Sequence, residues 1–178
     1  MHKTLYTLLI FLGAMLVNTS CSSDDDDDLW VWDFYPITLN VEVVDESGNN
    51  LLDPANPANI LSLPITLTHD GETTPIEMYE QKEATPNSRA YLARWYGAYI
   101  IGAPYISDGR YRIFIGEWDA FAKDDSVKLN IDGKEYELSF TNSYKAQKHG
   151  AYDFNRKYYI DGQANEYGNY KIVLNLQH

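Results

Sequence analysis

Apolar and polar residues alternate along several short segments of the chain, which is the pattern of strands that bury one face and expose the other. The clearest case is segment 36–44, PITLNVEVV. Its apolar face consists of Ile37, Leu39, Val41 and Val43. The polar segment 45–50, DESGNN, follows and predicts a turn, while Pro54 and Pro57 exclude a regular helix in the loop beyond it.

Three dipeptides predict tight turns between neighbouring strands. Segment 126–140 alternates on both sides of Asp132-Gly133, which tolerates the positive φ angles of a type I′ hairpin turn. Asp70-Gly71 closes another strand, and segment 74–80, TPIEMYE, is expected to be its returning partner. Asp161-Gly162 follows the sequence RKYYI and marks a third turn.

The remaining strands are expected in segments rich in β-branched and aromatic residues. Segments 89–102 and 110–119 are of this kind, with a short helix over residues 90–94 as the alternative within the first. Segment 167–178 places Tyr170, Ile172, Leu174 and Leu176 on one face. Together the segments predict seven to nine strands and an all-β fold, an antiparallel β-sandwich.

Composition narrows the possible functions. The chain carries 26 acidic and 14 basic residues, a net charge of −12, without a cluster of Lys and Arg. Nucleic acid is therefore excluded as a partner, because its binding depends on clustered cations that replace counterions. Aromatic residues make up 14% of the chain, including 15 Tyr, a residue that suits both a half-buried sheet and a binding surface.

Residues 1–20 have the layout of a secretory signal peptide: Lys3, an apolar run over residues 5–17, then small polar residues. The run is shorter than the roughly 20 apolar residues that cross a bilayer, so we expect the segment to be removed. Cys21, the single cysteine, comes next. Residues 18–21, NTSC, resemble the lipobox of a bacterial lipoprotein precursor. The resemblance implies cleavage before Cys21 and its acylation with chains such as palmitate, which would anchor the protein in a membrane.

An acidic run follows this cysteine. The sequence CSSDDDDD is similar to the export signal of surface lipoproteins of Bacteroidetes-type bacteria, which marks them for the outer face of the outer membrane. The signal would consist of Ser22, Ser23, Asp24, Asp25, Asp26, Asp27 and Asp28. The resemblance implies a cell-surface location with outer-membrane lipid as a partner. Because adjacent carboxylates repel one another, we expect residues 21–33 to form a solvated tether and residues 34–178 one domain.

Segment 39–54, LNVEVVDESGNNLLDP, resembles the first strand and turn of transthyretin-like and carboxypeptidase-regulatory-like domains. The resemblance implies an Ig-like or transthyretin-like Greek-key order of strands. The same turn offers oxygen atoms at the spacing of a calcium loop, from Asp45, Ser47, Asn49 and Asp53. It lacks the bidentate Glu of such a loop, so we favour an Asx-type hairpin turn and expect no metal.

The chain has few signs of catalysis. We expect His69 and His149 to be exposed loop residues. Glu117 and Asp119 are the carboxylate pair to inspect for glycoside hydrolysis, although ending a strand and capping the next loop is the favoured role for them. The nucleophile elbow, the zinc-binding histidine pair and the glycine-rich phosphate loop do not occur in the sequence. We therefore expect neither an enzyme nor a cofactor.

A group of aromatic residues supplies the candidate ligand site: Trp95, Tyr96, Tyr99, Tyr105, Trp118 and Phe121. Such rings either form the core or bind a glycan or another surface protein. Coplanar, exposed rings of Trp95, Tyr99 and Trp118 would favour a glycan. The sequence thus predicts a surface lipoprotein that acts as a non-catalytic binding or structural module. The alternatives are a glycan-binding accessory protein of a polysaccharide-utilisation system, and a fimbrial or adhesin subunit whose terminal strand is exchanged between subunits.

Overall fold

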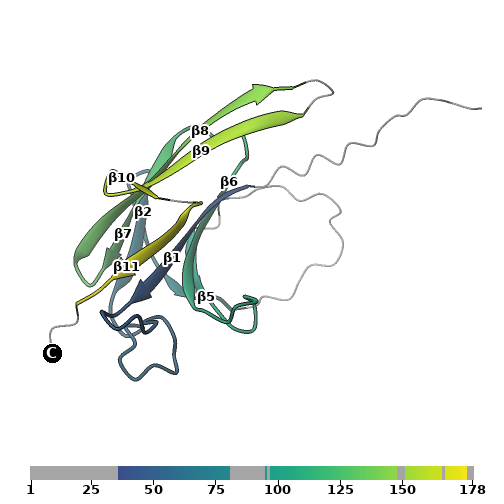
Figure 1. The fold of residues 1–178 in the computed structure, drawn as a ribbon. Coiled ribbons are helices and arrows are strands. Elements are labelled where there is room, and N and C mark those ends of the chain that lie inside the picture. Colours follow the sequence, from purple (N-terminus) through teal and green to yellow (C-terminus); the bar gives the residue numbers. More distant parts are fainter. Residues whose placement is uncertain (1–35, 81–94, 96, 148–150, 166, 176–178) are drawn as a thin grey trace, which may run out of the picture. The chain divides into compact units, whose positions relative to one another are not determined.

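The fold comes from a computed structural model, which describes residues 36–80, 95, 97–147, 151–165 and 167–175 (Figure 1). The described residues contain strands and no helix. All the strands belong to the unit Phe34–His178. The expected signal peptide, Cys21 and the acidic tether lie outside the described residues, as do Tyr96, His149 and the alternative helix.

The strands form two sheets, one of five strands and one of six. The five-stranded sheet has the order β11 (Asn169–Val173), β1 (Ile37–Val44), β6 (Arg112–Trp118), β5 (Ala98–Ile101) and β4 (Glu77–Met78). The six-stranded sheet has the order β10 (Gln163–Asn165), β9 (Tyr152–Ile160), β8 (Lys134–Ala146), β7 (Asp125–Ile131), β2 (Ile65–His69) and β3 (Glu72–Pro75). The predicted all-β sandwich is confirmed.

The core between the sheets follows the alternation in the sequence. Ile37, Leu39, Val41 and Val43 of β1 are fully buried. Val127, Leu129 and Ile131 of β7 face them from the other sheet, within one hydrophobic cluster. In β11, Tyr170 and Ile172 are buried in the same cluster. Because strand residues point alternately to opposite sides, the intervening residues of each strand make up the two outer faces.

The predicted tight turns adopt the expected backbone. Asp132 and Gly133 have φ angles of 50° and 85°, as a type I′ turn requires. Asp70-Gly71 and Asp161-Gly162 also have positive φ at both residues. A further turn of this kind, Tyr167-Gly168, was not predicted. Gly168 is needed there, because a Cβ atom would lie 2.9 Å from the carbonyl oxygen of Thr38.

The structure differs from the expected strand arrangement in two respects. It has eleven strands among the described residues instead of seven to nine, because several are very short. Segment 74–80 does not form one returning strand: it pairs with β2 up to Pro75, then crosses to the other sheet, where β4 runs parallel to β5. The last hydrogen bond to β2 comes from the next residue, since the amide of Ile76 donates to the Ile65 carbonyl oxygen at 2.9 Å, and Glu77 already pairs with Tyr99 of β5. The sandwich is also not wholly antiparallel, since β1 and β11 form a second parallel pair.

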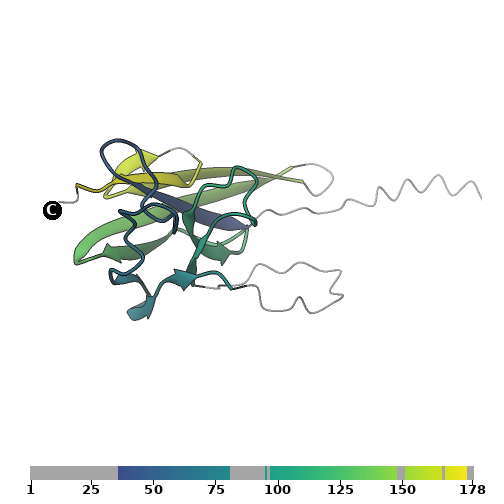
Figure 2. The ribbon, with the colours of Figure 1, turned by 90° about the horizontal axis from the view of Figure 1, so that it is seen from below.

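The two ends of the sandwich carry different features. The loop between β1 and β2 lies at one end, and the hairpin of β8 and β9 extends toward the other (Figures 1 and 2). Residues 141–146 and 152–157 of this hairpin pair with each other, beyond the last pair of β7 with β8 at Asp125 and Phe140. The outer face of the five-stranded sheet lies between these ends, and it carries the candidate site.

Candidate functional site

The aromatic residues predicted as one ligand site belong to three separate clusters. Trp95 and Trp118 lie against His69. Tyr99 and Tyr105 both contact Tyr79. Phe121 packs against the β8–β9 hairpin, with its ring centroid 5.0 Å from those of Tyr144 and Tyr152 and 5.4 Å from that of Phe154. Tyr96 lies outside the described residues.

The coplanar set of Trp95, Tyr99 and Trp118 is not formed. Trp118 is only 8% exposed and belongs to the core. Its ring is inclined at 58° to that of Trp95. Trp118 was a candidate ligand contact with the core as the other possibility, and its position at the end of β6 turns it inward, on the face that carries Ile37 in the neighbouring strand. Support for glycan binding must therefore come from another part of the molecule.

A row of side chains crosses the outer face of the five-stranded sheet. The strand registers pair Asn169 with Asn40, Asn40 with Phe114, Phe114 with Tyr99, and Tyr99 with Glu77. These residues lie on the side opposite the core, because their neighbours Leu39, Ile113 and Ile100 are buried. We call this surface the outer-face site. It consists of the row, of the adjacent charged residues Glu42, Arg112 and Lys171, and of the neighbouring rings of Tyr79 and Tyr105.

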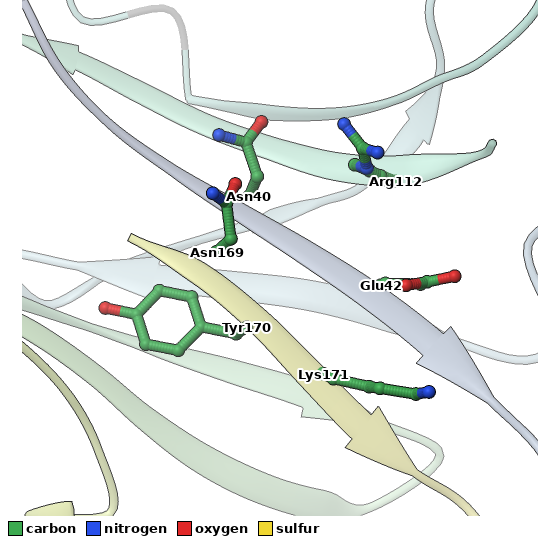
Figure 3. Close-up of a pocket in the computed structure, with 6 residues that line it drawn as sticks. All are labelled: Asn40, Glu42, Arg112, Asn169, Tyr170 and Lys171. Carbon is green, nitrogen blue, oxygen red and sulfur yellow. The ribbon is translucent and has the colours of Figure 1, made fainter. Parts of the chain in front are cut away.

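The polar half of the outer-face site is a shallow cleft of about 310 Å³ (Figure 3). It is lined by Asn40, Glu42, Arg112, Asn169, Tyr170 and Lys171. Figure 3 shows Asn40 beside Asn169, with the charged side chains further along the strands. The side chain of Tyr170 points to the core instead, where its hydroxyl donates a hydrogen bond to the Ser139 carbonyl oxygen at 3.2 Å.

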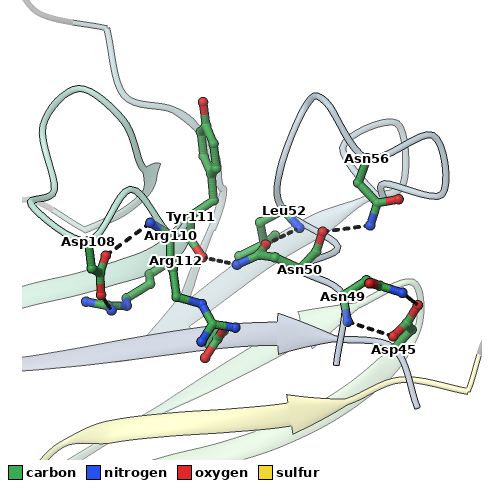
Figure 4. Close-up of polar contacts among 10 residues, drawn as sticks. Asp45, Asn49, Asn50, Leu52, Asn56, Asp108, Arg110, Tyr111 and Arg112 are labelled. Atoms are coloured by element: carbon green, nitrogen blue, oxygen red, sulfur yellow. Dashed lines mark hydrogen bonds and ion pairs between the residues drawn. The ribbon is translucent and has the colours of Figure 1, made fainter. Parts of the chain in front are cut away.

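Ion pairs hold two charged side chains of this cleft, Glu42 and Arg112. Glu42 is paired with Arg110, and Arg112 with Asp108. The backbone amide of Arg110 donates to Asp108 at 3.0 Å, which lowers the pKa of that carboxyl group, and the Arg112 guanidinium adds to the effect (Figure 4). The side chains of Glu42 and Arg112 are 16% and 27% exposed, so both are oriented before a ligand arrives.

The loop before β2 is fixed to the same sheet. Asn50 donates a side-chain hydrogen bond to the Tyr111 carbonyl oxygen at 2.8 Å and accepts one from the amide of Leu52 (Figure 4). Asn56 donates to the carbonyl oxygen of Asn50 in turn. These amide side chains bind backbone groups that would otherwise be unpaired, and they hold this loop to the segment that enters β6.

The aromatic half of the outer-face site is a continuous group of rings. Tyr99 and Phe114 are stacked, with centroids 5.1 Å apart and planes inclined at 25°. Tyr79 lies 5.0 Å from Tyr99, and Tyr105 lies 5.3 Å from Tyr79. Tyr79 and Tyr105 are 38% and 46% exposed, and the stacked pair is half-buried. Of these rings, Tyr99 and Tyr105 were candidate ligand contacts in the sequence, whereas Tyr79 and Phe114 were not.

His69 is not the exposed loop residue that was expected. It ends β2 on the inward side, after Ile65 and Leu67, and its side chain is 17% exposed. Its Nε2 lies 2.8 Å from Oδ2 of Asp125, and the indole N–H of Trp118 donates to the same oxygen at 2.7 Å. The inward direction of His69 could have been predicted from the sequence, because His69 continues the alternating series of buried residues Ile65 and Leu67.

Two of the residues considered for calcium, Asp45 and Asp53, accept hydrogen bonds within their own turns. Both carboxylate oxygens of Asp45 accept hydrogen bonds from Asn49, through its side chain and its backbone amide, and these bonds lower the pKa of Asp45 (Figure 4). Asp53 accepts from the amide of Ala55 at 2.8 Å. The favoured Asx-type hairpin turn is confirmed.

Glu117 and Asp119 occupy the favoured positions at the end of a strand. Glu117 lies in β6, and Asp119 follows it. The carboxylate of Asp119 accepts from the amide of Phe121 at 2.8 Å, so it caps the next loop. This hydrogen bond gives Asp119 a structural role in the turn that brings Phe121 to the β8–β9 hairpin.

Comparisons with known proteins give no relative: no family model, curated protein or solved structure matches the chain. In the part of the chain that the structure describes, no helix is long and apolar enough to span a membrane. Among the described residues, polar and aromatic side chains line a cleft at the outer-face site and another beside His69.

Proposed function

We propose that this protein is a lipid-anchored module on the surface of a bacterial outer membrane, and that it binds a glycan without catalysis. The anchor rests on the sequence, in which a signal-like segment is followed by Cys21 and five aspartates. β1 begins at Ile37, so residues 22–36 of the sequence are available as a tether between the lipid and the domain. The glycan rests on the outer-face site.

The observation that carries the glycan proposal is the row from Asn169 to Tyr99. It places amide groups beside aromatic rings on one face of a sheet. Amide, carboxylate and guanidinium groups donate to and accept from hydroxyl groups in fixed directions. Aromatic rings cover the apolar faces of a ligand. A sugar presents both kinds of surface at once, since its hydroxyl groups lie at the ring edge and its C–H groups on the ring faces.

The dimensions of the site favour an extended ligand. The row crosses five strands, whose spacing of about 4.8 Å gives a length of roughly 19 Å. A single sugar would contact only part of such a row. We therefore propose an oligosaccharide that runs across the strands, with its polar contacts at Asn40 and Arg112 and its stacking contacts at Phe114 and Tyr99.

The alternative of a fimbrial subunit gains no support from the arrangement of β11. This strand pairs in parallel with β1 of its own chain, and the amide of Leu174 donates to the Val44 carbonyl oxygen at 2.8 Å. Tyr170 and Ile172 are buried in the chain's own core. Exchange of this strand between subunits would have to displace these contacts.

Titration against a panel of oligosaccharides tests the ligand. We expect Tyr99→Ala and Arg112→Ala each to weaken the affinity for a bound oligosaccharide at least tenfold, which corresponds to about 1.4 kcal/mol. Tyr144→Ala is the matched control, because Tyr144 is 50% exposed on the β8–β9 hairpin, outside the outer-face site. An absence of binding across the panel, or equal affinities for all variants, contradicts the glycan proposal.

Mass spectrometry of the protein isolated from its native membrane tests the anchor separately. We expect the mature chain to begin at an acylated Cys21 and a Cys21→Ser variant to be released from the membrane. We also expect protease to digest the protein on intact cells. An unmodified thiol at residue 21 would contradict the anchor, and protection until lysis would contradict display at the surface. Neither result would affect the glycan titration.

A further inference from the structure

We infer that a second site, the cleft beside His69, binds an organic cation, namely an alkylammonium or guanidinium group. The cleft is lined by Leu67, His69, Asp70, Glu72, Thr74 and Trp95, and its volume is about 330 Å³. That volume lies at the lower end of the range for small-molecule sites. The inference does not depend on the outer-face site or on glycan binding.

A hydrogen-bonded network builds the rear wall of this cleft. Oδ2 of Asp125 lies 2.8 Å from Nε2 of His69 and 2.7 Å from the indole nitrogen of Trp118. Oδ1 of Asp125 accepts from the amide of Ser126 at 2.7 Å. Asp125 begins β7, His69 ends β2 and Trp118 ends β6, so both sheets contribute to the network. The imidazole is held in one orientation.

The network also determines which imidazole nitrogen accepts hydrogen bonds. An ionised carboxylate only accepts, so Nε2 of His69 carries the proton that is shared with Asp125. In the neutral ring, Nδ1 then has a free lone pair. Nδ1 lies 3.9 Å from the carboxylate of Asp70, whose side chain is 88% exposed. The two groups therefore present neighbouring acceptors to an N–H donor.

When His69 is neutral, all the charged side chains that line the cleft are negative. Asp70 and Glu72 contribute carboxylates, and Glu72 is the register partner of His69 across β2 and β3. The described residues that line the cleft include neither Lys nor Arg. Asp125 adds a third carboxylate behind the imidazole. A cationic ligand is thus the electrostatic complement of the cleft.

The apolar lining distinguishes an organic cation from a metal ion. Leu67 is 1% exposed, and Trp95 is 39% exposed with its ring 4.2 Å from that of His69. An indole ring attracts an ammonium or guanidinium group over its face, and the exposed part of the Trp95 ring covers a hydrocarbon stem. Ligand atoms of His69, Asp70 and Asp125 also lie within 4.8 Å of one another, so a metal ion is the competing outcome.

Calorimetry and tryptophan fluorescence with the full chain test the inference, using 1-aminopentane, 1-pentanol and zinc chloride as separate probes. We expect 1-aminopentane to bind and to change the fluorescence, because Trp95 lines the cleft. We expect 1-pentanol to bind at least tenfold more weakly, and added salt to weaken the binding of the amine. N-acetyl-lysine methylamide distinguishes the source of the cation: tighter binding than 1-aminopentane supports a lysine side chain of a protein, and weaker binding supports a free amine.

Four variants locate the binding. We expect about tenfold weaker binding of 1-aminopentane in each of three cleft variants, Asp70→Asn, Glu72→Gln and Trp95→Leu. Glu137→Gln is the control, because it removes the charge of an exposed residue on β8 and should leave the binding unchanged. Denaturant unfolding of each variant verifies that it is folded. Three results would overturn the inference: equal binding of amine and alcohol, amine binding that is insensitive to all three cleft variants, or zinc binding at His69 without any amine binding.

Discussion

The outer faces of the two sheets differ in how far their charged side chains are constrained. On the six-stranded sheet, Lys128 and Glu135 form an ion pair at 2.9 Å, and each side chain is 54% exposed. On the five-stranded sheet, Glu42 and Arg112 are 16% and 27% exposed and lie beside stacked rings. Exposed pairs contribute little to stability and remain mobile. Partly buried side chains have lost that freedom in advance, which lowers the entropic cost of binding a ligand.

The largest expected effect comes from the core that supports both faces. Leu129 of β7 is fully buried, and Leu129→Ala should lower the free energy of unfolding by about 2–5 kcal/mol, through lost burial and a cavity. Denaturant unfolding measures this loss. Val173→Ala on β11 is the control, since Val173 is 51% exposed and should change stability little. Similar losses in the two variants would contradict the arrangement of the core.

The next largest loss of stability is expected when the hydrogen bonds of Asp125 to His69 and Trp118, which join the two sheets, are removed. Asp125→Ala would leave the N–H groups of His69 and Trp118 without their acceptor, at a cost of about 1–3 kcal/mol in unfolding free energy. Asp125→Asn keeps an oxygen acceptor and should cost less. Denaturant unfolding of both variants gives the comparison. If the Asn variant were as unstable as the Ala variant, hydrogen bonding to Asp125 would not be the cause.

A second link between the sheets is sensitive to alkaline pH. Burial, together with the nearby Tyr158, raises the pKa of Tyr170 well above its usual value of about 10. The contribution of this group to stability is therefore complete below about pH 10 and is lost as the pH rises further. Tyr170→Phe should cost about 0.5–1.5 kcal/mol at neutral pH, because the bond to Ser139 is lost.

Unfolding measured between pH 8 and 11 examines this dependence. The Tyr170→Phe variant should lose less stability over that interval than the unchanged protein. Tyr144→Phe serves as the control, since Tyr144 is exposed and its variant should follow the unchanged protein. Parallel curves for Tyr170→Phe and the unchanged protein would contradict a role for Tyr170 ionisation.

The smallest effect is expected on the outer face of the six-stranded sheet. The hydrogen bond to Glu135 raises the pKa of Lys128, but both side chains are surrounded by water. Lys128→Gln should leave the midpoint of thermal unfolding and the affinity for an oligosaccharide unchanged within error. A clear loss of oligosaccharide binding in this variant would place the ligand on the six-stranded sheet and contradict the outer-face site.

Strands and turns could be predicted from the sequence more successfully than the pairing between strands. Alternation located β1 and β7 to β8, and Asp-Gly dipeptides located three turns. Within β6, alternation places Phe114 on the face opposite to that of the buried Ile113. It could not predict that residues 77 and 78 join the other sheet, because strand pairing depends on the register of distant segments.

The candidate sites were harder to predict for the same reason. The outer-face row joins Asn169, Asn40, Phe114 and Tyr99, which come from four strands. His69 and Asp125 are 56 positions apart in the sequence. Aromatic content alone does not separate a core ring such as Trp118 from a ring on the outer face such as Tyr99. Only the direction of each residue from its strand decides between them.

The parallel pairing of β1 with β11 has a consequence for biosynthesis. One edge of β1 remains without its partner until residues 169–173 have been made, long after β1 itself has left the ribosome. Such distant pairing is slow to form. The emerging chain should therefore stay incompletely folded during most of its synthesis, until its last strand has been made.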